Sequence, residues 1–183
     1  MRPSRVYMLA AGTALVLIAA AWVSRDSFRP VGPGVEAPAF QYPTLDGESL
    51  SLEQFRGKVV LVNLWATWCP PCRHEMPSMQ RLYDDLRDQP FEILAVSVDA
   101  RKGEVGPDGR EGGDVAAFVE EMGLTFPILL NPSGDIQRAY QTTGLPESFL
   151  VGPDGVIRRK VAGGTNWDAP AYREQIARML DQP

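Results

Sequence analysis

Apolar residues in this chain form short runs of strand length that alternate with segments of helical spacing. The run from Lys58 to Trp65 is apolar and rich in β-branched residues, which predicts a buried strand. After it, apolar residues recur three and four positions apart: Met76, Met79, Leu82, Tyr83 and Leu86. This spacing predicts a helix that runs to about Asp88. Further strands are predicted from Phe91 to Val98 and from Phe126 to Leu130.

The rest of the chain continues this alternation. A hairpin is expected from Ala39 to Leu52, with Asp46-Gly47 as its turn. Helices are expected over Val115 to Met122, Asp135 to Gln141 and Pro170 to Leu180, and a second hairpin joins the strands Glu147 to Val151 and Val156 to Val161. Strands that alternate with helices and end in a hairpin and a helix predict an α/β fold. Its mixed central sheet would carry helices on both faces.

The two cysteines and the single histidine lie together between the first buried strand and the first long helix. Cys69-Pro70-Pro71-Cys72 therefore opens a helix. A helix N-terminus lowers the pKa of a cysteine, and the thiolate is the nucleophile in disulfide exchange. We expect Cys69 to be the exposed, attacking sulfur and Cys72 to resolve the mixed disulfide. Pro70 and Pro71 fit the first turn but offer no N–H to the Cys69 sulfur, which favours a reductant over a strong oxidant.

Other uses of this cysteine spacing fit less well. A zinc site needs about four ligands, and only Cys69, Cys72 and His74 are available as typical ones. Covalent haem attachment requires a histidine directly after the second cysteine, where this chain has Arg73. A purely structural pair is a further alternative, but the position of the cysteines between a strand and a helix argues against it. We expect redox chemistry that needs no metal and no bound cofactor.

Glu75 is the next candidate, because it follows Cys72 by three positions and so lies on the same helix face. A carboxylate there can take the proton of the Cys72 thiol as that sulfur attacks, and burial would raise its pKa towards the working range. The alternative is an ordinary solvated helix glutamate.

The N-terminus bears on the compartment. Residues 6–23 are uncharged and follow Arg2 and Arg5, which predicts a signal anchor over residues 1–28 ahead of a redox domain over residues 29–183. A cleaved signal peptide and a buried core helix are the alternatives. The positive-inside rule places the redox domain on the periplasmic side of the inner membrane, as a single-pass protein. With 183 residues and a net charge of -5, the chain has room for one domain and no footprint for nucleic acid.

Two segments carry a resemblance to a known family. Trp68-Cys69-Pro70-Pro71-Cys72 after a strand, and residues 144–150 before the final hairpin, resemble the thioredoxin superfamily. Residues 57–69 and the Glu-x-Pro at Glu75 are similar to its membrane-anchored branch of TlpA, ResA and CcmG (DsbE) type. The branch's strand–helix insertion matches residues 115–141.

The resemblance implies roles for further residues. Pro146 would be a cis-proline that faces the cysteine pair, and the backbone of Leu145 would pair with a substrate peptide, beside Trp68. Thioredoxin has a buried aspartate where this chain has Asn63, so the resemblance assigns proton transfer to Glu75 instead.

The implied activity is an extracytoplasmic thiol–disulfide oxidoreductase that reduces disulfides in client proteins and draws electrons from a membrane thiol donor. Its clients would carry the haem-binding cysteines of apocytochrome c or the cysteines of a copper site. A disulfide-forming oxidase, a thiol peroxidase and a Sco-like copper protein are the alternatives. The polar loop from Arg101 to Asp114 is longer than is usual in the branch; it either shapes partner choice or is a neutral insertion.

Overall fold

The computed structural model describes residues 3–24 and 30–181. The chain divides into two compact units, Met1–Pro30 and Val31–Pro183. Arg2 and the predicted boundary between residues 28 and 29 lie outside the described residues.

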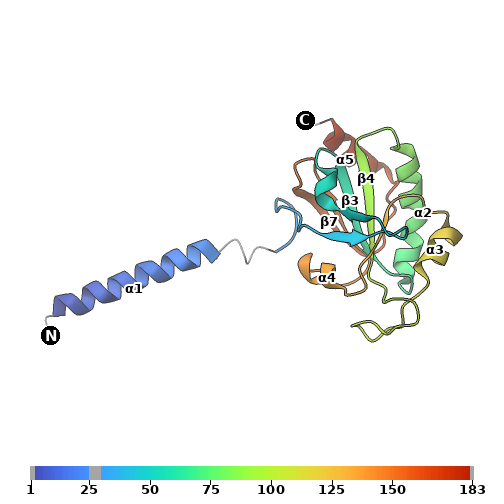
Figure 1. The fold of residues 1–183 in the computed structure, drawn as a ribbon. Helices are drawn as coiled ribbons and strands as arrows, with labels where there is room; N and C mark the ends of the chain where they lie inside the picture. Colours follow the sequence, from blue (N-terminus) through green and yellow to red (C-terminus); the bar gives the residue numbers. More distant parts are fainter. Residues whose placement is uncertain (1–2, 25–29, 182–183) are drawn as a thin grey trace. The chain divides into compact units, whose positions relative to one another are not determined.

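The first unit contains helix α1, Pro3–Ser24 (Figure 1). No helix in the described part of the chain combines the length and the apolar character needed to cross a membrane. The predicted membrane anchor is therefore not confirmed.

The second unit is built on a five-stranded sheet with the order β5–β4–β3–β6–β7. The central strands are β3 (Val59–Trp65) and β4 (Phe91–Ser97), and the others are β5 (Ile128–Leu130), β6 (Glu147–Val151) and β7 (Ile157–Ala162). Strands β3, β4 and β5 run parallel, whereas β6 and β7 are antiparallel to their neighbours. The predicted mixed sheet is thus confirmed. Every residue of β3 is buried, as its continuous apolar run predicts.

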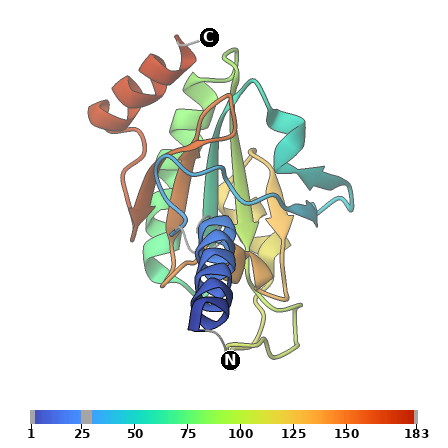
Figure 2. The same ribbon diagram turned by 90° about the vertical axis from the view of Figure 1, so that its left-hand side faces the viewer.

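Helices cover both faces of this sheet, as predicted. Helix α2 (Pro70–Asp85) and helix α3 (Val115–Met122) lie on one side, and α4 (Asp135–Ala139) lies on the other (Figures 1 and 2). Trp65 of β3 packs on Phe118 of α3 with their ring centroids 5.1 Å apart. On the opposite face, Phe149 of β6 packs on Tyr140, directly after α4, at 4.8 Å. Helix α5 (Pro170–Leu180) is joined to α2 by an ion pair between Arg173 and Asp85.

The predicted N-terminal hairpin is also present. Strands β1 (Gln41–Pro43) and β2 (Ser49–Ser51) pair antiparallel and lead into a 3₁₀ turn, η2 (Leu52–Phe55). Phe40, just before β1, contacts Tyr140 with ring centroids 6.1 Å apart. The hairpin therefore extends the hydrophobic core on the α4 side of the sheet.

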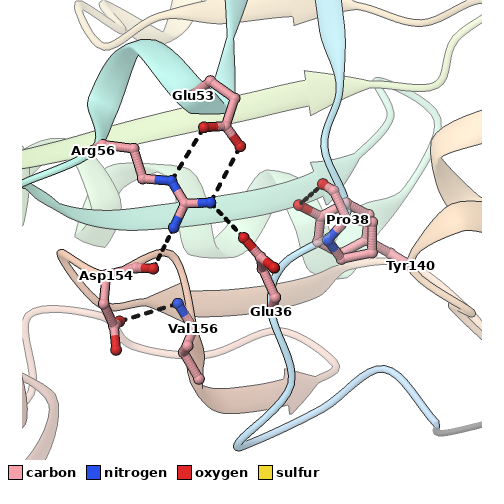
Figure 3. Close-up of polar contacts among 7 residues, drawn as sticks. All are labelled: Glu36, Pro38, Glu53, Arg56, Tyr140, Asp154 and Val156. Carbon is pink, nitrogen blue, oxygen red and sulfur yellow. Dashed lines mark hydrogen bonds and ion pairs between the residues drawn. The ribbon is translucent and has the colours of Figure 1, made fainter. Parts of the chain in front are cut away.

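Arg56 fastens this hairpin region to the turn between β6 and β7 (Figure 3). Its guanidinium contacts the carboxylates of Glu36 and Glu53, at 2.6 Å and 3.1 Å, and donates to the backbone carbonyl of Asp154. Gly155 makes this approach possible, because a Cβ atom there would lie 1.7 Å from the guanidinium. The clamp therefore depends on a glycine at position 155.

Replacing Gly155 with alanine is expected to destabilise the protein in two ways. Its φ of +79° strains any L-residue by about 1–2 kcal/mol, and the new methyl group would also displace Arg56. Gly47→Ala is the matched control, since Gly47 has a φ of +84° but no neighbouring atom in the way. Urea unfolding of the full-length chain should show a larger loss for Gly155→Ala; equal losses would mean that the Arg56 clamp adds no stability.

Candidate active site

The cysteine pair lies where β3 gives way to α2. Cys69 is the N-cap of α2, and the two sulfurs form a disulfide. The Cys69 residue is 4% exposed and Cys72 is fully buried. The prediction of an exposed Cys69 is therefore wrong for this oxidised form. Its sulfur is turned inward, because it bonds to Cys72 and accepts the backbone N–H of Cys72 at 3.3 Å.

The first turn of α2 offers few backbone donors to the Cys69 sulfur. Pro70 and Pro71 occupy its first two positions and have no N–H. The N–H of Arg73 donates to the backbone carbonyl of Cys69, at 3.1 Å, and so is not directed at the sulfur. The N–H of Cys72 is the one donor that the first turn directs at this sulfur.

Glu75 is buried one turn further along α2, with 2% of its surface exposed. Its Oε1 accepts from the Asn63 side chain at 2.7 Å. Its Oε2 accepts from the Thr165 backbone at 3.1 Å and from Trp167 Nε1 at 3.4 Å. The three donors come from β3 and from the segment between β7 and α5. A carboxylate is thus held at a fixed position on the same helix face as Cys72.

Burial raises the pKa of Glu75 to about 7, although its three hydrogen bonds act in the opposite direction. Desolvation destabilises the charged carboxylate by more than the hydrogen bonds from the three neutral donors stabilise it. A group with this pKa exchanges a proton near neutral pH, as a general acid or base must. The predicted burial and the raised pKa of Glu75 are both present.

Asn63 can serve both protonation states of this carboxylate. Its Nδ2 donates to Glu75 and to Ser148 Oγ, the latter at 2.8 Å. Its Oδ1 is buried and has no hydrogen-bond partner among the described residues. An amide flip would present this oxygen to a protonated Glu75, and the Ser148 hydroxyl can donate as well as accept.

A polar surface cavity of about 450 Å³ reaches Glu75. Its wall combines side chains of α2 with the segment that follows β7: Pro71, His74, Pro77, Ser78, Arg81, Gly164, Thr165 and Asn166. The cavity gives water access to the neighbourhood of the carboxylate, so a proton held by Glu75 has a route to solvent.

Pro146 follows a cis peptide bond from Leu145, as the resemblance implied. It immediately precedes β6, whose first residue, Glu147, pairs with Leu64 of β3. Since β3 leads directly into the Cys69 turn, the proline lies at the same end of the sheet as the disulfide. The Pro146 carbonyl accepts from the Gly163 N–H at 2.8 Å. Pro146 is buried and Leu145 is partly exposed.

Glu147 is a buried carboxylate next to the cis-proline. Its Oε1 lies 3.5 Å from Lys160 Nζ on β7, and its Oε2 has no hydrogen-bond partner among the described residues. Burial raises its pKa, and the lysine opposes that change. Its side chain extends from the face of β6 opposite to Ser148, so Glu147 is not part of the Glu75 network.

Asp99 ties the turn before the cysteines to the loop between β4 and α3. It accepts the backbone N–H of Thr67 at 2.9 Å and the Thr67 hydroxyl at 2.6 Å. The Gly113 N–H also points to Asp99, at 3.4 Å. Farther round the loop, the Arg110 guanidinium carbon lies 4.2 Å from the centre of the Trp68 ring. The loop is exposed, as predicted, but its ends are fixed against the active-site turn.

Sequence reasoning missed Asp99, Arg110 and the Thr165–Trp167 segment. The position of Asp99 held a usable signal, since the carboxyl ends of parallel strands meet at one edge of a sheet. Trp167 sits in an irregular segment with no periodic pattern, so its contact with Glu75 could not be read from spacing.

Among the described residues no group of three or more His, Cys, Asp or Glu side chains could hold a metal.

Comparisons with known proteins agree with this geometry. Residues 33–160 match the AhpC/TSA family. The chain is 37% identical over 147 residues to the thiol–disulfide oxidoreductase ResA of Geobacillus thermodenitrificans, covering 80% of this chain and 79% of that protein. It is 30% identical over 171 residues to ResA of Bacillus subtilis, covering 89% and 88%.

Two solved structures share the fold. One is a Chlorobium tepidum protein provisionally assigned as the thiol:disulfide interchange protein DsbE, with a TM-score of 0.70, 30% identity and coverage of 81% of this chain and 97% of that one. The other is the thioredoxin domain of a thiol–disulfide oxidoreductase from Bacteroides vulgatus, with a TM-score of 0.66, 29% identity and coverage of 81% and 98%. The chain belongs to the thioredoxin-like AhpC/TSA family and is a thiol–disulfide oxidoreductase of the ResA and DsbE type.

Proposed function

We propose that the protein acts as a reductase of disulfides in client proteins. The observation that carries this direction is the pair of prolines at the start of α2, which leaves the Cys69 sulfur one backbone donor. Fewer donors stabilise the thiolate less, so the reduced form gives up its electrons more readily.

The reaction proceeds in two balanced steps. The Cys69 thiolate attacks one sulfur of the client disulfide, which forms a mixed disulfide and releases the other client sulfur as a thiolate. Cys72 then gives its proton to Glu75 and attacks the Cys69 sulfur. This step breaks the mixed disulfide, releases the second client thiolate and forms the Cys69–Cys72 disulfide. Two electrons pass to the client, and the buried Glu75 holds the proton until it leaves through the polar cavity.

The client is proposed to lie across Trp68 and the Leu145–Pro146 bond. Leu145 precedes β6 and is partly exposed, so its backbone can pair with an extended client segment while the Cys69 sulfur attacks. The resemblance to the TlpA, ResA and CcmG branch supports clients that carry the haem-binding cysteines of apocytochrome c or the cysteines of a copper site.

Action outside the cytoplasm is part of the proposal. It is supported by the sequence of residues 1–23, where Arg2 and Arg5 precede an uncharged run. In an oxidising compartment the protein would need a membrane thiol donor to return Cys69 and Cys72 to the dithiol. A reporter enzyme that is active only outside the cytoplasm, fused after Pro183, should be active; a silent fusion that is made in full would contradict this placement.

The reduction potential tests the direction of electron flow. Equilibration of the full-length chain with dithiothreitol buffers should give a reduction potential of about -220 mV or lower, towards the thioredoxin value of about -270 mV. A value near about -120 mV, that of the strong periplasmic oxidant, would make the protein a disulfide-forming oxidase. Turnover of hydrogen peroxide by the same preparation would support a thiol peroxidase instead.

A further inference from the structure

The loop between β4 and α3 has an ordered structure of its own. Lys102 bridges to Gly112, and Val105 bridges to Glu111, so the two sides of the loop face each other. Lys102 also forms an ion pair with Asp114 at 2.6 Å, at the base of the loop.

The base of this loop is fitted closely to the active-site turn. Asp99 joins Thr67 and Gly113 through hydrogen bonds, and Asp99 itself is 4% exposed. A Cβ atom at Gly113 would lie 2.0 Å from the Thr67 hydroxyl, so the two segments approach as closely as a glycine allows. The position of the loop is therefore set by the turn that also sets Cys69, two residues beyond Thr67.

Arg110 is the loop residue that reaches the candidate client surface. Its guanidinium lies over the ring of Trp68, the residue directly before Cys69. Its Nη1 is 3.2 Å from Asp108, and the Arg110 side chain remains 57% exposed. A guanidinium has five N–H donors, so one face can stack on an indole while its edge still binds a carboxylate.

We propose that Arg110 is a specificity-determining residue, which favours client segments that carry a carboxylate within two residues of the attacked cysteine. The inference rests on the proposed reductase function and adds the chemistry of the preferred client. Stacking on Trp68 fixes the guanidinium over the residue that directly precedes the attacking cysteine, and the fixed loop keeps it there. Asp108 competes with the client carboxylate for the same cation. On this basis the long loop shapes partner choice and is not a neutral insertion.

Two disulfide-bonded peptides that differ only in an Asp or an Asn next to the cysteine provide the test. The rate constant of the reduced full-length protein with each peptide is divided by the rate constant of dithiothreitol with that peptide. This ratio removes the intrinsic effect of the carboxylate on the disulfide. We expect the wild-type protein to prefer the Asp peptide about two- to five-fold at low salt, the size of an exposed ion pair, and to lose the preference at high salt.

Variants assign the preference to one side chain. Arg110→Gln should reduce it to about one, and Arg110→Lys should keep part of it. Asp108→Asn should increase it, because the competing carboxylate is removed. Arg101→Gln is the matched control: it makes the same charge change in the same loop, at a residue that is 74% exposed and paired with Glu104 at 3.8 Å. Arg101→Gln should leave the preference unchanged.

The outcomes separate the two proposals. If the wild-type protein and Arg110→Gln each reduce the Asp and Asn peptides at the same normalised rate, the role of Arg110 is overturned. The reductase function is not affected by that result. A preference that Arg101→Gln removes as well would show a general charge effect, which also contradicts the inference. Failure of the wild-type protein to reduce either peptide faster than dithiothreitol would overturn the reductase function, and the inference with it.

Discussion

In the Cys72→Ser variant, a client disulfide should be attacked once and then remain bound to Cys69. Serine fills the space of the buried cysteine but cannot expel the client, so the mixed disulfide accumulates and multiple turnover is lost. Non-reducing gels and intact-mass measurement should show a stoichiometric adduct that dithiothreitol releases. Adducts of this variant isolated from cells would also identify the clients. We expect these to be proteins with haem-binding or copper-site cysteines.

The reciprocal variant tests the assignment of roles. Cys69→Ser should form no adduct, because Cys72 has no exposed surface and no client sulfur can reach it. An adduct on Cys72 in this variant would reverse the two roles. Cys69 itself is only 4% exposed in the oxidised form, so its attack on a client is expected to need a greater exposure of its sulfur in the reduced form.

Glu75→Gln should slow the resolving step by about 100-fold or more, the usual contribution of a positioned general base. In the wild-type protein the rate of release from a preformed mixed disulfide should rise with pH through about 7, because Glu75 must be deprotonated to take the Cys72 proton. In the variant that rise should move to the ordinary range of a thiol, about 8.5 or above. Stopped-flow release of a fluorescent client measures both.

Glutamine suits this test because the site can hold it. Its oxygen can accept from Thr165 and Trp167, and its NH₂ can donate to the free Oδ1 of Asn63 after an amide flip. An unchanged rate and pH profile in a folded Glu75→Gln protein would assign Glu75 a structural role only.

The raised pKa of Glu75 should also make the free energy of unfolding depend on pH. Its pKa is about 7 in the folded chain and near 4.5 when unfolded, so the folded state binds more protons between these values. The stability therefore falls as pH rises through this window, by about 3 kcal/mol in total. Urea unfolding at pH 5 and pH 8 should show the loss in the wild-type protein and a much smaller one in Glu75→Gln.

Local patterns in the sequence were enough to predict most elements. Each of these patterns depends only on residues close together in the sequence. They are the continuous apolar run of β3, the three-and-four spacing of α2, and the turn residues at Asp46-Gly47 and before β7. The pair Cys69 and Cys72, and the position of Glu75 one turn later, follow from helical geometry alone. Their roles could therefore be proposed without a structure, but the burial that raises the pKa of Glu75 could not be predicted from spacing.

Tertiary contacts decided what no local pattern contains. The raised pKa of Glu75 and the position of Arg110 over Trp68 depend on residues 12 to 92 positions away, brought together by the sheet and its loops. A pKa depends on desolvation and on donors from every side, and a stacked guanidinium depends on where a loop is fastened. Spacing along the chain determines which residues share a helix face or a strand, whereas packing determines which of them meet across the fold.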